Sequence, residues 1–377
     1  MLNSVLPTSV PAIGELEISL FGPGYGEAIA LHIGDGNWVL VDSCLRPNTR
    51  TPASLQYLKD IGVDVAQSVK LIVATHWHDD HVRGISTLVE ECESARLVVS
   101  TALSTTQFLK LVSLYTRRIT DTSAGLDEFG RVFAILNSRK ETGNTLYTAK
   151  LASSNRILYR GTLQLRNTTT PIIVSSLSPS DASMTKAMAA FADLLPEEEP
   201  RKRLSSVSPN HASVVLWIQV GHHQILLGAD MERTNDTETG WSAIVDNSMV
   251  VSGVAGVFKV AHHGALSGHE SRIWTEMLSD SPMAILSPFC NGNKRLPTTD
   301  DIERISGLTP HAYITAYPGL QRHKWDNKIV RGQIEQVTRQ IRNAQAGWGV
   351  IRLRQNIFEE NPSWRVDLEG NARSLRN

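Results

Sequence analysis

The chain has 377 residues, of which 41% are hydrophobic and 20% charged, and its formal net charge is −1. This length fits one large domain or two ordinary ones, and the apolar fraction supplies a sizeable core. A net charge near zero excludes a global positive field that would attract nucleic acid, although a local patch or bound metal ions could still attract a polyanion.

Cysteine usage and the terminal residues bear on the compartment. Cys44, Cys92 and Cys290 are widely spaced and form no CxxC pair, which argues against a disulfide scaffold and against a thiolate zinc site. Residues 1–7 lack a basic start followed by an apolar run, and no apolar run approaches the ~20 residues that cross a bilayer. We therefore expect a cytoplasmic protein with free thiols and no membrane partner.

The first hundred residues alternate between apolar runs and glycine turns. Strands are predicted at 15–20, 28–33, 38–42, 69–74 and 95–100, and helices at about 52–60 and 82–93.

The segment 101–209 is less regular. Helices are predicted near 108–114 and 126–136, and strand-like runs occur at 157–159 and 172–174. Met184, Met188, Phe191 and Leu195 recur at helical spacing, which predicts a helix that packs on the core. The charged run 197–203 contains a proline and predicts a solvated loop.

Strand patterns return after residue 210. Strands are predicted at 213–220, 224–228, 256–260, 283–287, 313–315, 349–354 and 364–368, with helices at 299–306 and about 327–346. Strand groups on both sides of a helical middle predict an α+β fold, a four-layer αββα sandwich. We expect one domain over 1–320 with 101–209 as a partly helical insertion, and a helix and strands in 321–377 that pack on the same domain.

The most informative stretch runs from Thr75 to His81 and reads THWHDDH, directly after the apolar run 69–74. Imidazole nitrogen and carboxylate oxygen hold zinc and similar divalent ions, and catalytic sites leave one position open for water. Because alternate residues point the same way, His76, His78 and Asp80 can face one pocket. The sequence therefore predicts a metal centre at this strand end.

Two later strand ends carry ligand-type residues as well. Asp230 follows the apolar run 224–229, where the alternative is an ordinary helix-cap or turn aspartate. His262 and His263 follow the run 257–261 and precede Gly264, and two adjacent imidazoles in a core would need polar partners. We expect Asp230 and His262 to be metal ligands, with His263 beside them.

The pattern His-x-His-x-Asp-His at a strand end resembles the signature of the metallo-β-lactamase superfamily. With the runs 20–28, 39–42, 210–216, 259–264 and 293–297, the chain from about residue 15 to residue 319 resembles the hydrolase domain of ComEC-type competence proteins, a DNA-uptake channel family. Glu27 stands where that family commonly has aspartate, and Ala229-Asp230 replaces Gly-Asp. The resemblance implies a free-standing relative that hydrolyses phosphodiester bonds, with DNA as the expected substrate.

A ligand set follows from the resemblance. It implies two divalent ions, Zn²⁺ or alternatively Mn²⁺, with His76 and His78 on the first ion and Asp80, His81 and His262 on the second. Asp230 would bridge them, and Asp80 would also orient a metal-bound hydroxide as nucleophile. The superfamily usually adds a third histidine to the first ion; His211 is the candidate, and the alternative is a weakly held first ion.

Residues for the substrate side are also expected. His263 would face the scissile group or support a ligand, and Lys259 would neutralise an oxyanion or phosphate unless it simply reaches solvent. Ser213 and Asn293 could donate hydrogen bonds to phosphate. A basic rim could be formed by Arg83, Arg201, Lys202, Arg203, Lys294 and Arg295.

Three functions fit these residues. The first is a metal-dependent phosphodiesterase or nuclease, favoured by the His-His-Gly segment and Asn293. The second is a metallohydrolase of lactone, thioester or amide bonds, and the third is a non-catalytic sensor or partner subunit of a multi-protein system. The sequence indicates no particular protein partner. Because 101–209 is long for a connection, we expect part of it to cover the active-site edge and to set substrate choice.

Overall fold

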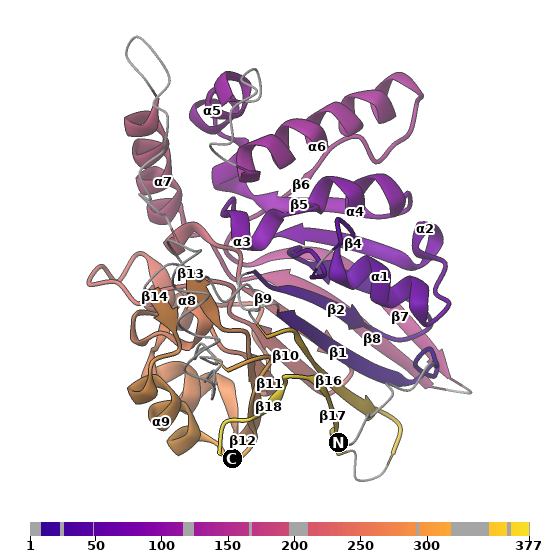
Figure 1. The fold of residues 1–377 in the computed structure, drawn as a ribbon, viewed down its shortest axis with the longest axis vertical. Coiled ribbons are helices and arrows are strands. Elements are labelled where there is room, and N and C mark those ends of the chain that lie inside the picture. The colour runs from indigo at the N-terminus through magenta and orange to yellow at the C-terminus, as the bar shows by residue number, and fades with distance from the viewer. Residues whose placement is uncertain are drawn as a thin grey trace, which may run out of the picture.

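Two β-sheets pack face to face, with helices on their outer faces (Figure 1). The computed structural model describes residues 9–22, 26–47, 49–115, 124–165, 168–195, 210–291, 294–317, 347–359 and 363–376. This arrangement confirms the expected four-layer α+β sandwich. The predicted loop 197–203 and helix 327–346 lie outside the described residues.

The first sheet has eight strands among the described residues. In spatial order they are β17 (Arg365–Gly370), β16 (Gly349–Asn356), β1 (Glu15–Gly22), β2 (Ala28–His32), β3 (Trp38–Val41), β4 (Val69–Ala74), β5 (Arg96–Ser100) and β6 (Lys150–Ala152). The strands β3 to β6 run parallel, so their carboxyl ends meet at one edge of the sheet.

The second sheet is built in the same way. Its order is β18 (Arg373–Ser374), β15 (Ala312–Ile314), β12 (Leu278–Leu286), β11 (Ala255–Lys259), β10 (His223–Leu227), β9 (Leu216–Val220), β8 (Thr168–Ser176) and β7 (Arg156–Leu165). Here β10, β11, β12 and β15 are parallel, which again gathers carboxyl ends at one edge. The short hairpin of β13 (Phe289–Asn291) and β14 (Lys294–Leu296) follows β12.

Three apolar clusters hold the layers together. One lies between the sheets and includes Leu16, Ile18 and Leu20 of β1, whose alternation placed them on one face. A second lies between the first sheet and the helices α1 (Ala53–Asp60), α4 (Ile85–Glu91), α5 (Thr106–Tyr115), α6 (Ala124–Glu141) and α7 (Asp181–Leu194). The third lies beneath α8 (Gly240–Asn247) and α9 (Thr299–Leu308).

One predicted helix is divided in the structure. The region 82–93 contains the end of α3 (Asp79–Val82) and then α4, separated by Gly84 at a φ of 83°. A Cβ atom on Gly84 would lie 2.9 Å from the side chain of Leu45, so the residue combines a left-handed backbone with a close approach. Because of this break, α3, which carries Asp80 and His81, does not have to follow the axis of α4.

The segment 101–209 is more than an insertion. It supplies β6 to the first sheet and β7 and β8 to the second, while α5, α6 and α7 stand at the end of the molecule near α3 (Figure 1). On α7 the buried apolar residues are Ala187, Phe191 and Leu194, whereas Met188 is 38% exposed. The helix therefore packs on the core as expected, through Phe191, whereas Met188 does not take part.

The C-terminal strands pair within the same two sheets. β16 pairs with β1 and with β17, and β18 pairs with β15. Among the described residues, no helix combines the length and apolar character that a bilayer span requires.

Candidate metal centre

Three loops that follow strand ends converge at one edge of the sandwich. The loop after β4 begins with Thr75 and His76, and its carbonyl at Thr75 accepts a hydrogen bond from the Val214 amide at 3.0 Å. Asp230 follows β10, and His262 and His263 follow β11. The His262 amide donates to the Ala229 carbonyl at 3.0 Å, which ties the last two loops together.

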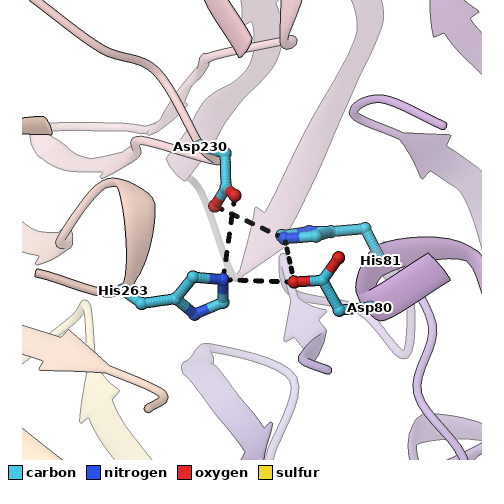
Figure 2. Close-up of side chains that lie close together, drawn as sticks. All are labelled: Asp80, His81, Asp230 and His263. Carbon is cyan, nitrogen blue, oxygen red and sulfur yellow. Dashed lines mark ion pairs between the residues drawn. The ribbon is translucent and has the colours of Figure 1, made fainter. Parts of the chain in front are cut away.

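The first group of candidate ligands consists of Asp80, His81, Asp230 and His263, and Figure 2 shows their side chains turned toward one another. His81 Nε2 lies 3.4 Å from Asp230 Oδ1, and His263 Nε2 lies 3.4 Å from Asp80 Oδ2. Four such ligand atoms lie within 4.8 Å of one another. Two imidazoles and two carboxylates at this spacing match the donor set of a divalent transition metal.

A second group shares one member with the first. His76, His78 and Asp230 also offer ligand atoms within 4.8 Å of one another, and His76 Nε2 lies 3.9 Å from Asp230 Oδ2. Asp230 therefore faces both groups with its two carboxylate oxygens, as a bridging ligand would.

The donor atoms themselves fit a metal. His76 Nε2, His81 Nε2, His263 Nε2 and Asp230 Oδ1 are buried and make no hydrogen bond. Buried polar atoms are normally hydrogen-bonded, because leaving one unpaired costs free energy. Divalent ions coordinated by these atoms would satisfy them, so the residues present fit the group that the motif implies.

The opposite nitrogen of each buried imidazole is held by a neighbour. Thr75 Oγ1 lies 2.9 Å from His76 Nδ1, and Asp42 Oδ2 lies 2.7 Å from His81 Nδ1. The Ser287 carbonyl oxygen lies 3.2 Å from His263 Nδ1. Such partners fix the ring orientation and keep Nε2 directed at the metal position.

Asp42 was not expected as a site residue. Its carboxylate accepts hydrogen bonds from the Thr75 amide at 2.8 Å and from Thr75 Oγ1 at 2.7 Å, besides its contact with His81. Asp42 directly follows β3, so the strand-end rule that singled out Asp230 would also have found it.

The pKa values of the candidate ligands are shifted by burial and by the contacts between imidazoles and carboxylates. Burial alone would raise the pKa of Asp230, but His81 and His263 outweigh it and hold this pKa well below its usual range. Burial would lower the pKa of His81, but Asp230, Asp42 and Asp80 raise it well above the ordinary value. Burial, reinforced by His81 and His78, lowers the pKa of His76, which favours the neutral, ligand form of this ring.

Backbone conformation at the centre is unusual. Asp42, Ala229, His262 and His263 have φ angles of 58°, 44°, 47° and 53°, although none is glycine. Left-handed conformations of non-glycine residues cost free energy and cluster at functional sites.

The two adjacent histidines have different neighbours, and this differs from the sequence expectation. His263, not His262, joins Asp80, His81 and Asp230. His262 Nδ1 instead lies 2.8 Å from Glu232 Oε1 and 3.0 Å from Ser267 Oγ. Two successive left-handed residues turn the chain sharply, which is why strand alternation did not reveal which imidazole points inward.

Lys259 also has surroundings other than those expected. Its side chain is fully buried, its ammonium forms an ion pair with Glu27, and it donates a hydrogen bond to the Ala229 carbonyl at 3.0 Å. Glu27 in turn accepts from Ser287 Oγ and lies 3.7 Å from His263 Nδ1. Lys259 therefore faces neither substrate nor solvent, but supports Glu27 behind the imidazoles.

We expect Lys259→Met to lower the free energy of unfolding by about 3–5 kcal/mol, because Glu27 would remain buried without a cationic partner. The double variant Glu27→Gln/Lys259→Met should recover part of this loss. The matched control is Lys59→Met, whose exposed pair with Glu91 contributes about 0–1 kcal/mol. Denaturant unfolding of the four proteins measures these differences, and equal effects at Lys259 and Lys59 would contradict the buried pair.

The remaining expected residues fall into two sets. The backbone of His211 lies in η2 (Asn210–Ala212), but its side chain is outside what the structure describes, as are Asn293, Arg201, Lys202 and Arg203. Ser213 Oγ is buried and makes no hydrogen bond, and Arg83 lies 4.0 Å from Asp79.

The hairpin β13–β14 carries two basic residues and neighbours the centre through Phe289. Lys294 Nζ lies 5.6 Å from the Phe289 ring centroid, and the Phe289 and His263 rings are 5.3 Å apart. Lys294 and Arg295 are both exposed, and the Lys294 ammonium lies over the Phe289 ring that neighbours His263.

The geometry agrees with a comparison of the chain with known families. Residues 22–107, which contain the THWHDDH run, match the model of the metallo-beta-lactamase superfamily. The chain has the metallo-β-lactamase fold. This match supports the superfamily that the motif resembles.

Other comparisons add little. A subclass B3 metallo-beta-lactamase isolated from a soil metagenome library is 12% identical to the chain, with a TM-score of 0.33. The match covers 71% of this chain and 86% of that one. No curated protein matches the chain.

Proposed function

We propose that this metallo-β-lactamase-fold chain is a hydrolase of phosphodiester bonds that works with two divalent ions, Zn²⁺ in the first instance. The observation that carries the proposal is Asp230, whose two carboxylate oxygens face both candidate ligand groups. Two-ion sites with a shared carboxylate suit displacement at phosphorus, because both the entering and the leaving oxygen need charge stabilisation.

Divalent ions at this centre would lower the pKa of water toward neutrality and offset the charge that develops on the phosphoryl oxygens. The chain's own groups would do the rest. His76 and His78 with Asp230 would hold one ion, and Asp80, His81 and His263 with Asp230 the other. Asp42 and Thr75 keep two of these imidazoles oriented.

His262 is the group to which we assign protonation of the leaving oxygen. It stands outside both ligand groups, and Glu232 lies 2.8 Å from its Nδ1. A carboxylate on one ring nitrogen leaves the other free to carry a proton to the reaction, as in general acid catalysis.

The exposed side chains of Lys294 and Arg295 favour the assignment of an anionic substrate. These exposed cations lie on the hairpin whose Phe289 contacts His263, so phosphates next to the scissile one could reach them. With the ComEC-type resemblance, this favours an oligonucleotide, and DNA is the first substrate to test.

The decisive experiment is cleavage of bis(p-nitrophenyl) phosphate and of single- and double-stranded DNA by protein reconstituted with Zn²⁺ or Mn²⁺. We expect metal-dependent turnover that Asp80→Ala abolishes, since Asp80 belongs to the first ligand group. Two bound ions without phosphodiester turnover would contradict the proposal and favour a lactone, thioester or amide substrate. A lack of turnover on all of these would leave the non-catalytic sensor or partner role.

A further inference from the structure

Trp77 is the residue between the ligands His76 and His78, and three helices of the segment 101–209 meet around it. Its ring centroid lies 6.4 Å from that of Phe108 on α5 and 6.3 Å from that of Phe191 on α7. The Phe108 ring in turn lies 5.3 Å from that of Phe129 on α6. Trp77 is only 9% exposed, so the centre of the metal motif is packed into the helical layer.

The beginning of α6 also touches the backbone of the motif. The Gly125 amide donates a hydrogen bond to Asp79 Oδ1 at 2.7 Å. A Cβ atom on Gly125 would lie 2.3 Å from the Trp77 carbonyl oxygen and 3.1 Å from Asp79 Oδ1. Because the nearest atom belongs to backbone, any side chain at position 125 would displace the peptide that joins Trp77 to His78.

A second contact fixes α6 one turn further along. Glu128 Oε2 accepts hydrogen bonds from the Ser86 amide at 3.0 Å and from Ser86 Oγ at 2.7 Å. Leu126 and Phe129 are buried in the cluster beneath the helical layer. The helix is therefore anchored on both sides of the break at Gly84, and it cannot retreat from the motif without losing these contacts.

Among the candidate ligands, His78 is the most sensitive to a displacement of the peptide that joins it to Trp77. The rings of His76, His81 and His263 each have a partner on Nδ1. Among the described residues, we find no hydrogen bond to the His78 ring, whose contacts are with the rings of His76 at 4.6 Å and Trp77 at 5.5 Å. The position of His78 thus depends on the backbone from Trp77 to Asp79.

We propose that Gly125 and Asp79 are positioning residues for the metal ion that His76, His78 and Asp230 would hold. The start of α6 holds the peptide after Trp77 so that His78 points at Asp230. The helical part of 101–209 is then a structural component of the metal centre and not a separable cover. This inference rests on the proposed function only in requiring that the centre binds divalent ions.

The test compares Gly125→Ala with Gly307→Ala in the full chain. Gly307 lies in α9, and a Cβ atom there would have no neighbour within 4 Å, so it controls for the helix preference of alanine. Zn²⁺ stoichiometry and affinity are measured by competition with a chelator, and the fold by circular dichroism and thermal unfolding. We expect Gly125→Ala to bind one of two ions about 10–100-fold more weakly, as for lost ligand support, while Gly307→Ala binds both normally.

Asp79 provides a second pair of variants in case Gly125→Ala does not fold. Asp79→Asn keeps an oxygen that can accept from the Gly125 amide, whereas Asp79→Ala does not. We expect Asp79→Ala to weaken the same ion and Asp79→Asn to retain it.

Several results would overturn the inference. They are a wild-type chain that binds no Zn²⁺, unchanged affinities in both Gly125→Ala and Asp79→Ala, or loss of both ions from folded Gly125→Ala. Wild-type protein that binds two ions but cleaves no phosphodiester would refute the proposed function alone, and the affinities of the variants would still decide the role of α6.

Discussion

Replacing Asp230 by alanine is expected to abolish the binding of both ions and to lower hydrolysis by about a thousandfold or more. Asp230 is the one residue common to the group of Asp80, His81 and His263 and the group of His76 and His78. Its oxygens lie 3.4 Å from His81 Nε2, 3.7 Å from His263 Nε2 and 3.9 Å from His76 Nε2. Without them, the group of His76 and His78 would keep no carboxylate, and Asp80 would be the single carboxylate in the group of His81 and His263.

Metal analysis and thermal unfolding with and without Zn²⁺ measure this effect. At an ion concentration a hundred times Kd, each occupied site should stabilise the wild-type fold by about 2.7 kcal/mol, and Asp230→Ala should show no such gain. Asp246→Ala is the control, since that exposed carboxylate pairs with Arg272 at the surface. Retention of two ions by Asp230→Ala would contradict the bridging role.

The second large effect separates His263 from His262. We expect His263→Ala to lose the ion that Asp80, His81 and His263 would hold, together with nearly all activity. The reason is that His263 Nε2 lies 3.4 Å from Asp80 and 3.7 Å from Asp230. His262→Ala should bind both ions and lose activity by about 10²–10⁴-fold, as expected for a missing general acid. Both residues have similar left-handed φ angles, so the two alanine variants carry the same backbone change.

Substrates with different leaving groups test the role of His262 further. A nitrophenolate leaves without help from an acid, whereas the alkoxide of a nucleotide needs a proton. His262→Ala should therefore impair DNA cleavage more than cleavage of bis(p-nitrophenyl) phosphate. Loss of one ion from His262→Ala, with both retained in His263→Ala, would instead restore the ligand set that the sequence motif implies.

Much of the architecture could be predicted from local patterns. The alternation in β1 placed Leu16, Ile18 and Leu20 on the face that packs between the sheets. The helix at 52–60 and the helix at 299–306 lie within two residues of α1 and α9. Other boundaries failed where a single glycine intervened, because the left-handed turn at Gly84 divides a continuous apolar pattern.

Long-range contacts decided what the patterns left open. On α7, helical spacing grouped Met188 with Phe191, but only Phe191 is buried, where it packs against Phe108 of α5. Lys259 read as a cation for substrate, but Glu27, more than two hundred residues earlier in the chain, lies beside it in the fold.

The sequence by itself determined the class of chemistry and its location. Imidazoles and carboxylates directly after strands must lie at a sheet edge, since parallel strands end together, and their donor atoms suit a divalent metal. Only the tertiary structure decided which of two neighbouring histidines enters the centre, which groups hold the rings, and that α6 supports the motif. Those features depend on left-handed backbone at His262 and His263 and on contacts between distant segments, which a local pattern of residues does not encode.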